Sequence, residues 1–169
     1  MQNKAVFLDR DGVINMETGD FVFETGKFEF TDGIFDALFR LQEAGFMLIV
    51  ITNQSGISTG RYTHQHVDRV HAMMLRELSS QGISITEIYY CPHHPSTGKC
   101  LCRKPECLLI EKAIARFNID PARSWMIGDR DRDIEAAAKG GVKGLLINSN
   151  EPIHQCVNEI IREKGGITL

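Results

Sequence analysis

Two aspartates, Asp9 and Asp11, stand two positions apart directly after a short apolar run. In an extended segment, side chains two residues apart point the same way, so the two carboxyl groups would share one small space. Close like charges favour a state in which one carboxylate is ionised while the other holds a proton. A nucleophile and a general acid need this arrangement. The alternative is a plain turn, in which an aspartate caps the bend at Gly12.

A third aspartate, Asp129, follows Gly128 after another apolar run. Three carboxylates in one place need a cation, and oxygen ligands suit Mg²⁺, which bridges carboxylates to phosphate groups. Ionised Asp9 and Asp129 with a phosphate dianion carry about −4, which Mg²⁺ and one lysine would reduce to about −1. The lysine that we expect is Lys104, although an Arg-Lys pair such as 103–104 is also common on solvated surfaces.

Residues 52–56, T-N-Q-S-G, follow a further apolar run and suit anion binding. A threonine hydroxyl and consecutive backbone N–H groups after a strand can surround an oxyanion. Taken alone, the segment could equally be an ordinary polar loop between a strand and a helix.

The five cysteines are unevenly distributed, with four of them between positions 91 and 107. In a reducing compartment, clustered cysteines indicate metal ligands before disulfides. The pattern C-x-H-x₆-C-x-C predicts a structural Zn²⁺ site whose ligands are Cys91, His93, Cys100 and Cys102. His94 is the competing imidazole, and we expect Cys107 and Cys156 to be small apolar residues of helices. The zinc would hold a short loop so that Arg103 and Lys104 point into the site.

Short apolar runs alternate with amphipathic patterns along the chain. The runs predict five strands, at residues 4–8, 46–51, 85–90, 124–127 and 144–148. The 3.6-residue periodicity predicts helices at about residues 32–44, 63–81, 106–117, 131–139 and 152–164. This alternation is typical of a Rossmann-like α/β fold, a doubly wound and mainly parallel sheet with helices on both faces. In such sheets ligands bind beyond the carboxyl ends of the strands, where all of these polar clusters would meet.

The composition excludes several classes of protein. The 169 residues include 22 acidic and 19 basic side chains, and the formal charge of −3 does not suit non-specific nucleic-acid binding. No apolar run approaches the roughly 18 residues of a membrane span. Lys4 leads straight into a strand, so we expect no signal peptide. We therefore expect a cytoplasmic, monomeric protein of one domain, residues 1–169, that binds neither nucleic acid nor membranes.

Taken together, these residues resemble the haloacid dehalogenase (HAD) superfamily of Mg²⁺-dependent phosphatases. Its motifs match in order: Asp9 and Asp11, Thr52, Lys104 and Asp129. Within the superfamily, five segments resemble the phosphatases that remove the C7 phosphate of D-glycero-D-manno-heptose 1,7-bisphosphate in lipopolysaccharide precursor synthesis. The segments are D-R-D-G-V-I-N (9–15), F-E-F-T-D-G (28–33), T-N-Q-S-G-I (52–57), Y-Y-C-P-H-H-P (89–95) and C-x-C-R-K-P (100–105).

The resemblance implies a role for each motif residue. Asp9 would attack phosphorus, and Asp11 would act first as general acid and then as general base. Thr52 and Lys104 would stabilise the transferring phosphoryl group, and Mg²⁺ would be held by Asp9, the Asp11 backbone carbonyl and Asp129. The substrate, a small phosphorylated sugar, would contact Asn53, Gln54, Ser55, Arg103 and Arg130.

The same resemblance predicts that no separate cap domain covers the site. Residues 15–31 are too few for one, and a single helix joins the second and third predicted strands. A zinc-binding loop, about residues 91–103, would be inserted after the third strand and form part of the wall of an open site.

Three alternatives stay open. Histidinol phosphate is the closest, because its amine would need an acid such as Glu17, Asp20 or Glu24, although the double histidine of C-P-H-H-P favours the heptose substrate. T-N-Q-x-G-I also occurs in polynucleotide 3′-phosphatases, which should carry a basic groove for the strand. A zinc-stabilised domain that only binds phosphorylated ligands would gain nothing from holding the motif aspartates and lysine together.

Overall fold

The computed structural model describes residues 2–165, and its centre is a five-stranded sheet in which all neighbouring strands are parallel. The strand order is β3-β2-β1-β4-β5. The strands are β1 (Ala5–Leu8), β2 (Met47–Asn53), β3 (Ile85–Cys91), β4 (Trp125–Gly128) and β5 (Lys143–Leu146). Phe7 in the central strand pairs with Ile49 on one side and Met126 on the other, which fixes the register of the middle of the sheet.

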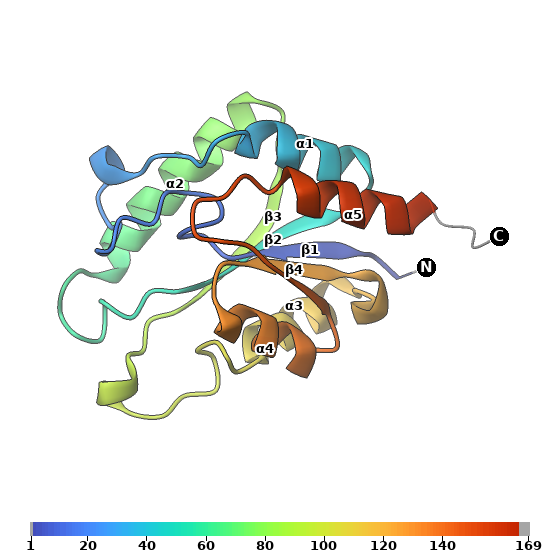
Figure 1. Ribbon diagram of the computed structural model, residues 1–169. Coiled ribbons are helices and arrows are strands. Elements are labelled where there is room, and N and C mark those ends of the chain that lie inside the picture. The colour runs from blue at the N-terminus through green and yellow to red at the C-terminus, as the bar shows by residue number, and fades with distance from the viewer. Residues whose placement is uncertain (1, 166–169) are drawn as a thin grey trace.

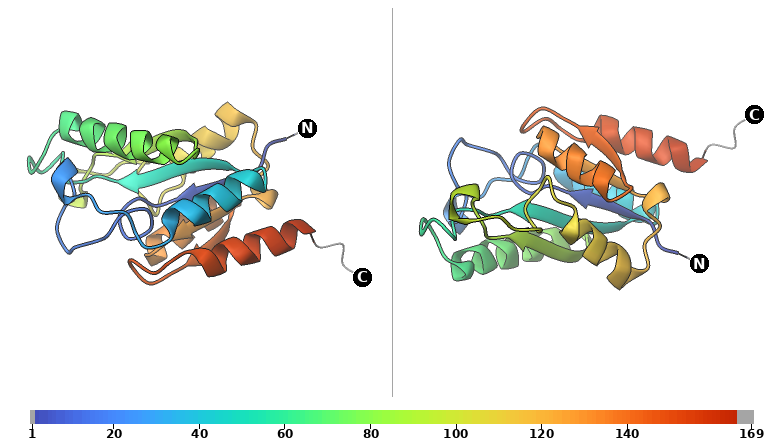
Figure 2. Two further views of the ribbon diagram at one scale, coloured as in Figure 1. Left: turned by 90° about the horizontal axis from the view of Figure 1, so that it is seen from above. Right: turned by 90° about the horizontal axis from the view of Figure 1, so that it is seen from below.

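Helices cover both faces of this sheet (Figure 1). One face carries α1 (Ile34–Glu43), α2 (His64–Ser80) and α5 (His154–Gly165), and the other carries α3 (Leu108–Phe117) and α4 (Asp131–Lys139). Three short 3₁₀ turns are η1 (Thr25–Lys27), η2 (Pro95–Thr97) and η3 (Pro121–Arg123). The views from above and below in Figure 2 show the two helical layers separately. The Rossmann-like α/β prediction is confirmed.

The two layers explain why the strands are continuous apolar runs. Along β1, Val6 and Leu8 pack with α1, α2 and α5, whereas Ala5 and Phe7 pack with α3 and α4. All four side chains are fully buried, because a central parallel strand has helices on both faces. All ten predicted helices and strands are present, with ends within two residues of the predicted ones. Within residues 2–165, no helix combines the length and apolar character that crossing a membrane requires.

The sheet order places a crevice where the site is expected. From β1 the chain moves one way to β2 and β3, and then returns past β1 to β4 and β5. Loops that leave neighbouring strands in opposite directions open a crevice at their carboxyl ends, here between β1 and β4. The segments after β1, β2, β3 and β4 all lie at this end of the sheet in Figure 1, opposite the start of β1.

Candidate active site

Three carboxylates converge at the crevice between β1 and β4. Asp9 directly follows β1, Asp129 directly follows β4, and Asp133 lies in the first turn of α4. One oxygen of each lies within 4.8 Å of the others. The loop after β1 is tied to β4, because the backbone N–H of Asp9 donates to the carbonyl of Ile127 at 3.0 Å. The structure thus brings Asp9 and Asp129 together as predicted, and adds a third aspartate.

Lys104 is fully buried among these acids. Its Nζ lies 2.9 Å from Asp9 Oδ1, 2.8 Å from Asp133 Oδ1 and 2.7 Å from the carbonyl oxygen of Ile51. The ammonium thus forms two ion pairs and one hydrogen bond to a backbone carbonyl. Burial alone would lower the pKa of Lys104, but the Asp9 and Asp133 carboxylates raise it, so the lysine is a stable cation.

For Asp9, by contrast, burial is the dominant effect on the pKa. Burial raises its pKa to about 7, since the attraction of Lys104 is outweighed by desolvation together with the repulsion from Asp133. Its Oδ1 also accepts a hydrogen bond from the backbone N–H of Arg10 at 2.8 Å. A divalent cation beside Asp9 would favour the ionised carboxylate, which is the form that can attack phosphorus.

The loop that carries Lys104 is fixed to β2 by a reciprocal pair of hydrogen bonds. The side-chain amide of Asn53 donates to the carbonyl of Lys104 at 3.2 Å and accepts from its N–H at 3.1 Å. We expected Asn53 to contact substrate. Asn53 lines the cleft, but its side-chain amide is hydrogen-bonded to this loop. Its observed contacts position the lysine.

Asp133 is the residue that the sequence analysis missed. It is fully buried, and its second oxygen accepts from the backbone N–H of Arg130 at 3.0 Å. Gly128 makes room for it, because a Cβ there would come within 2.2 Å of the Asp133 Cβ. The available signal was its place in the first turn of the helix predicted directly after Asp129, which puts it at the carboxyl end of the same strand.

Asp11 is held by donors from three side chains. Arg10 binds it through Nη2, at 2.8 and 3.1 Å from its two oxygens, and through Nε at 3.3 Å. Asn15 and Gln54 each donate an amide N–H at 3.0 Å. The Asp11 side chain keeps 22% of its surface exposed, toward the same cleft that Asp9 lines. Asp9 and Asp11 therefore face one space but have different partners.

Thr52 is 1% exposed and is not among the residues that line the cleft, and its hydroxyl accepts from the amide of Gln54 at 3.1 Å. Ser55 is nearly buried and lines the cleft directly.

The cleft has about 180 Å³ of space and walls of opposite charge. The basic wall consists of Arg103, Arg130 and Arg132. Burial and the neighbouring Arg132 lower the pKa of Arg103 from its ordinary value, which reflects two positive groups in proximity. Among residues 2–165, Arg132 forms no ion pair with an acidic side chain. Two neighbouring guanidinium groups on one wall make a site for an anion.

The acidic wall comes from the segment after β1. Glu17 and Asp20 line the cleft there, together with Phe21 and Val22. Glu24, the third acid that we considered for an amine substrate, instead pairs with Lys27 at 3.4 Å, away from the cleft.

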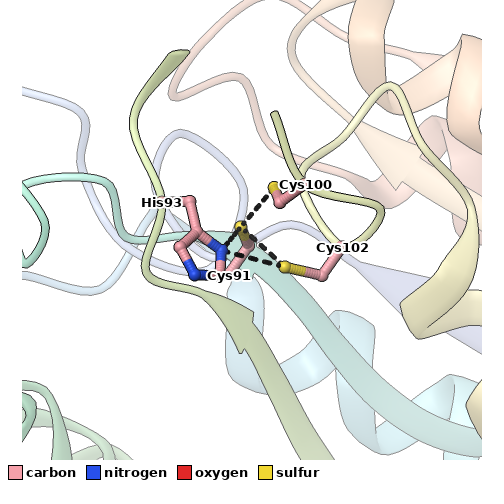
Figure 3. A group of neighbouring side chains, drawn as sticks. All are labelled: Cys91, His93, Cys100 and Cys102. Atoms are coloured by element: carbon pink, nitrogen blue, oxygen red, sulfur yellow. Dashed lines mark hydrogen bonds between the residues drawn. The ribbon is translucent and has the colours of Figure 1, made fainter. Parts of the chain in front are cut away.

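The four predicted metal ligands after β3 point toward one another (Figure 3). The separations of the ligand atoms are 3.0 Å for Cys91–Cys102, 3.3 Å for His93–Cys102, 3.5 Å for Cys91–His93 and 3.7 Å for Cys91–Cys100. Around a tetrahedral Zn²⁺ with bonds of about 2.3 Å, sulfur ligands would lie roughly 3.8 Å apart. The set therefore fits a small tetrahedral metal. His94 lies outside it, bonded to Ser96.

The remaining cysteines are separate from this group. Cys107 directly precedes α3, and Cys156 lies in α5 with its side chain buried in the core. The Cys/His cluster sits one residue before Arg103, whose guanidinium donates to the carbonyl of His93 at 3.2 Å. A metal bound by this cluster would stabilise the backbone that holds Arg103 in the basic wall.

Comparison with known proteins places this chain in a family. A profile of HAD-hydrolase-like proteins matches residues 101–155. The D-glycero-β-D-manno-heptose-1,7-bisphosphate 7-phosphatase of Haemophilus ducreyi is 42% identical over 153 residues, 87% of this chain and 84% of that protein. The enzyme of that name from Escherichia coli K12 is 40% identical over 156 residues, 88% of this chain and 81% of that protein. The chain belongs to this family of HAD phosphatases.

Solved structures agree with this assignment. The D,D-heptose 1,7-bisphosphate phosphatase of B. bronchiseptica, solved with magnesium and phosphate, superimposes with a TM-score of 0.88 at 29% identity. The superposition covers 95% of this chain and 99% of that one. The HAD phosphatase fold predicted from the motifs is confirmed.

The buried arginine that binds Asp11 depends on a neutral histidine. Arg10 has no exposed surface, and its Nη1 lies 3.3 Å from Nε2 of His71. Because a guanidinium can only donate, this Nε2 must accept, and the imidazole must be neutral. Burial and the charge of Arg10 lower the pKa of His71 to about 3, against the weaker attraction of Asp11.

This buried histidine predicts how stability depends on pH. In the unfolded chain His71 is protonated near its ordinary pKa of 6.5, whereas in the folded protein the pKa of His71 is about 3. Acidification therefore favours unfolding, and the contribution of His71 is present above pH 6.5 and lost as pH falls toward 3. We expect His71→Gln, which keeps an acceptor for Arg10, to reduce the loss of stability between pH 6.5 and 4.5 by about 2 kcal/mol. Denaturant titrations at the two pH values measure this, and equal losses in both proteins would contradict it.

Proposed function

We propose that this protein is a Mg²⁺-dependent phosphatase that hydrolyses the C7 phosphate of D-glycero-D-manno-heptose 1,7-bisphosphate, in the β-anomeric form that its relatives' names specify. The observation that carries the proposal is the group of Asp9, Lys104, Asp129 and Asp133, of which Asp9 and Asp129 line a cleft with a basic wall, in a chain about 40% identical to such enzymes. The residue roles that follow are part of the proposal.

In the first step, an oxygen of Asp9 attacks phosphorus, and the bond from phosphorus to the C7 oxygen breaks. The product is an aspartyl-phosphate and the sugar alcohol. Lys104 and the Thr52 hydroxyl neutralise charge on the phosphoryl oxygens, since positioning and electrostatics dominate phosphoryl transfer. Lys104 is already fixed at 2.9 Å from Asp9, so little rearrangement is needed when the phosphate arrives.

Asp11 moves the proton in both steps. It donates a proton to the departing C7 oxygen, and then, as a carboxylate, takes one from the water that attacks the aspartyl-phosphate. The water oxygen bonds to phosphorus, Asp9 is released, and Asp11 is protonated again. The exposed part of its side chain faces the cleft, where the leaving oxygen would lie.

Mg²⁺ fits the oxygen-only donor set formed by Asp9, Asp129 and Asp133. We propose that Asp9, Asp129 and the backbone carbonyl of Asp11 hold it, with Asp133 committed to Lys104 at 2.8 Å. When bound, the ion would neutralise the phosphate and favour ionised Asp9.

The basic wall is the proposed site for the second phosphate. Arg103 and Arg130 were expected there, and Arg132 joins them. Glu17 and Asp20 also line the cleft and would accept hydrogen bonds from sugar hydroxyls. Gln54 and Ser55 would complete the sugar site. A bisphosphate would supply an anion for Arg103 and Arg132, which the monophosphate of histidinol would not, whereas Arg130 already pairs with Asp129 at 3.4 Å.

We propose that the Cys/His group binds one structural Zn²⁺ through all four ligands, in a loop over residues 91–103 of a single domain. Monomeric state, cytoplasmic location and the absence of nucleic-acid and membrane partners stay predictions.

Elemental analysis tests the zinc site. We expect one zinc per chain in the purified protein, and Cys102→Ser should lose it and lower kcat/KM about tenfold, because Arg103 and Lys104 follow directly. Cys107→Ser is the matched control and should retain zinc and activity, since this thiol lies outside the group. Full zinc in the Cys102 variant would contradict the assignment.

Phosphate release with Mg²⁺ tests the function. Both anomers of heptose 1,7-bisphosphate and histidinol phosphate are compared, and we expect kcat/KM for the β-bisphosphate to exceed that for histidinol phosphate by at least about 10²-fold, roughly 2.7 kcal/mol. Asp9→Asn should abolish turnover while leaving the fold intact. A preference for histidinol phosphate, or activity in the Asp9 variant, would contradict the proposal.

A further inference from the structure

Gln54 contacts two of the proposed catalytic residues through one amide. Its side chain is 2% exposed, and Nε2 donates to Asp11 Oδ2 at 3.0 Å and to Thr52 Oγ1 at 3.1 Å. Its Oε1 accepts from the hydroxyl of Tyr62 at 2.8 Å. All polar atoms of this amide are therefore engaged.

The chemistry of the partners fixes the orientation of this amide. A carboxylate only accepts hydrogen bonds, so the NH₂ group must face Asp11 and the carbonyl must face Tyr62. The Tyr62 hydroxyl must then donate. A flipped amide would place its carbonyl against the Asp11 carboxylate, so Asp11 selects the orientation, and the Tyr62 hydroxyl, as a donor to Oε1, holds the amide in it.

Tyr62 itself is held in place from several sides. It is 4% exposed, and its ring stacks on Phe23 at 5.1 Å between centroids and meets the edge of Phe21 at 5.4 Å. Gly56 permits this packing, because a Cβ there would lie 2.1 Å from the Tyr62 ring. Burial raises the pKa of Tyr62 to about 12, so the phenol keeps its proton at neutral pH.

We propose that Tyr62 is a positioning residue for the general acid, whose hydroxyl fixes the amide of Gln54 so that Gln54 orients the carboxyl of Asp11. The inference rests on the role of Asp11 in the proposed function. Tyr62 does not line the cleft and acts only through Gln54.

Tyr62→Phe removes the hydroxyl and keeps the ring packing, so it isolates this effect. A misplaced general acid impairs departure of a sugar alkoxide, which needs a proton, more than departure of p-nitrophenolate, which needs little. We expect kcat/KM for heptose 1,7-bisphosphate to fall about tenfold, roughly 1.4 kcal/mol. We expect kcat/KM for p-nitrophenyl phosphate to change less than about twofold, because later hydrolysis of the aspartyl-phosphate does not enter this constant.

A double-mutant cycle tests whether the hydroxyl acts through Gln54. Gln54→Ala should lower kcat/KM for heptose 1,7-bisphosphate, and adding Tyr62→Phe to it should cause no further loss, because residues acting as a unit are not additive. Tyr90→Phe is the matched control. Its hydroxyl bonds His64 outside the cleft at 2.7 Å, and its removal should leave both rates unchanged.

The substrate ratio is measured on one preparation, so partial unfolding cannot imitate the selective loss. Equal losses for both substrates, no loss, or additive effects with Gln54→Ala would each overturn the inference. Failure of the wild-type protein on heptose 1,7-bisphosphate would instead overturn the proposed function, and the comparison would then use whichever alkyl phosphate it hydrolyses.

Discussion

A buried ammonium group between two carboxylates is the interaction on which the site depends. Lys104 lies within 3 Å of Asp9 and Asp133 and is 1% exposed. Removing ions from water costs several kcal/mol each, and only close pairing offsets that cost. The fold must therefore bring three segments to one point with little tolerance: the end of β1, the first turn of α4 and the loop after the Cys/His group.

The rest of the architecture achieves this convergence. Parallel strands deliver Asp9 and Asp129 to the same edge of the sheet, and the reversal in strand order leaves a crevice between them. Hydrogen bonds from Asn53 fix the Lys104 loop to β2. The Cys/His group brings together the two ends of the segment that precedes this loop, residues 91–102. Arg103 and Lys104, two of the cations proposed to contact substrate, thus lie on a loop that both groups of contacts restrain.

Sequence reasoning succeeded where the signal was local. Apolar runs and helical periodicity predicted the five strands and five α-helices found within residues 2–165, although not the three 3₁₀ turns, and the C-x-H-x₆-C-x-C spacing predicted the group of possible metal ligands. Asp133 was missed because its neighbours in α4, among them exposed Asp131, make it look like one of several acids in a solvated first turn. Tyr62 and Arg132 were missed because no local pattern pairs them with Gln54 and Arg103, and only the folded loops decide which side chains meet.

The most direct test of this account is kcat/KM for Asp133→Asn beside Asp131→Asn. Asp133→Asn keeps the shape of the side chain but removes one of the two carboxylates that hold Lys104. We predict a fall of about 10²-fold, roughly 2.7 kcal/mol, with a loss of stability of about 3 kcal/mol because the charge balance of a buried group is broken. Asp131→Asn, two positions earlier and exposed, should be unchanged in both. Activity of the Asp133 variant within twofold of wild type would contradict the dependence of the site on this buried ion group.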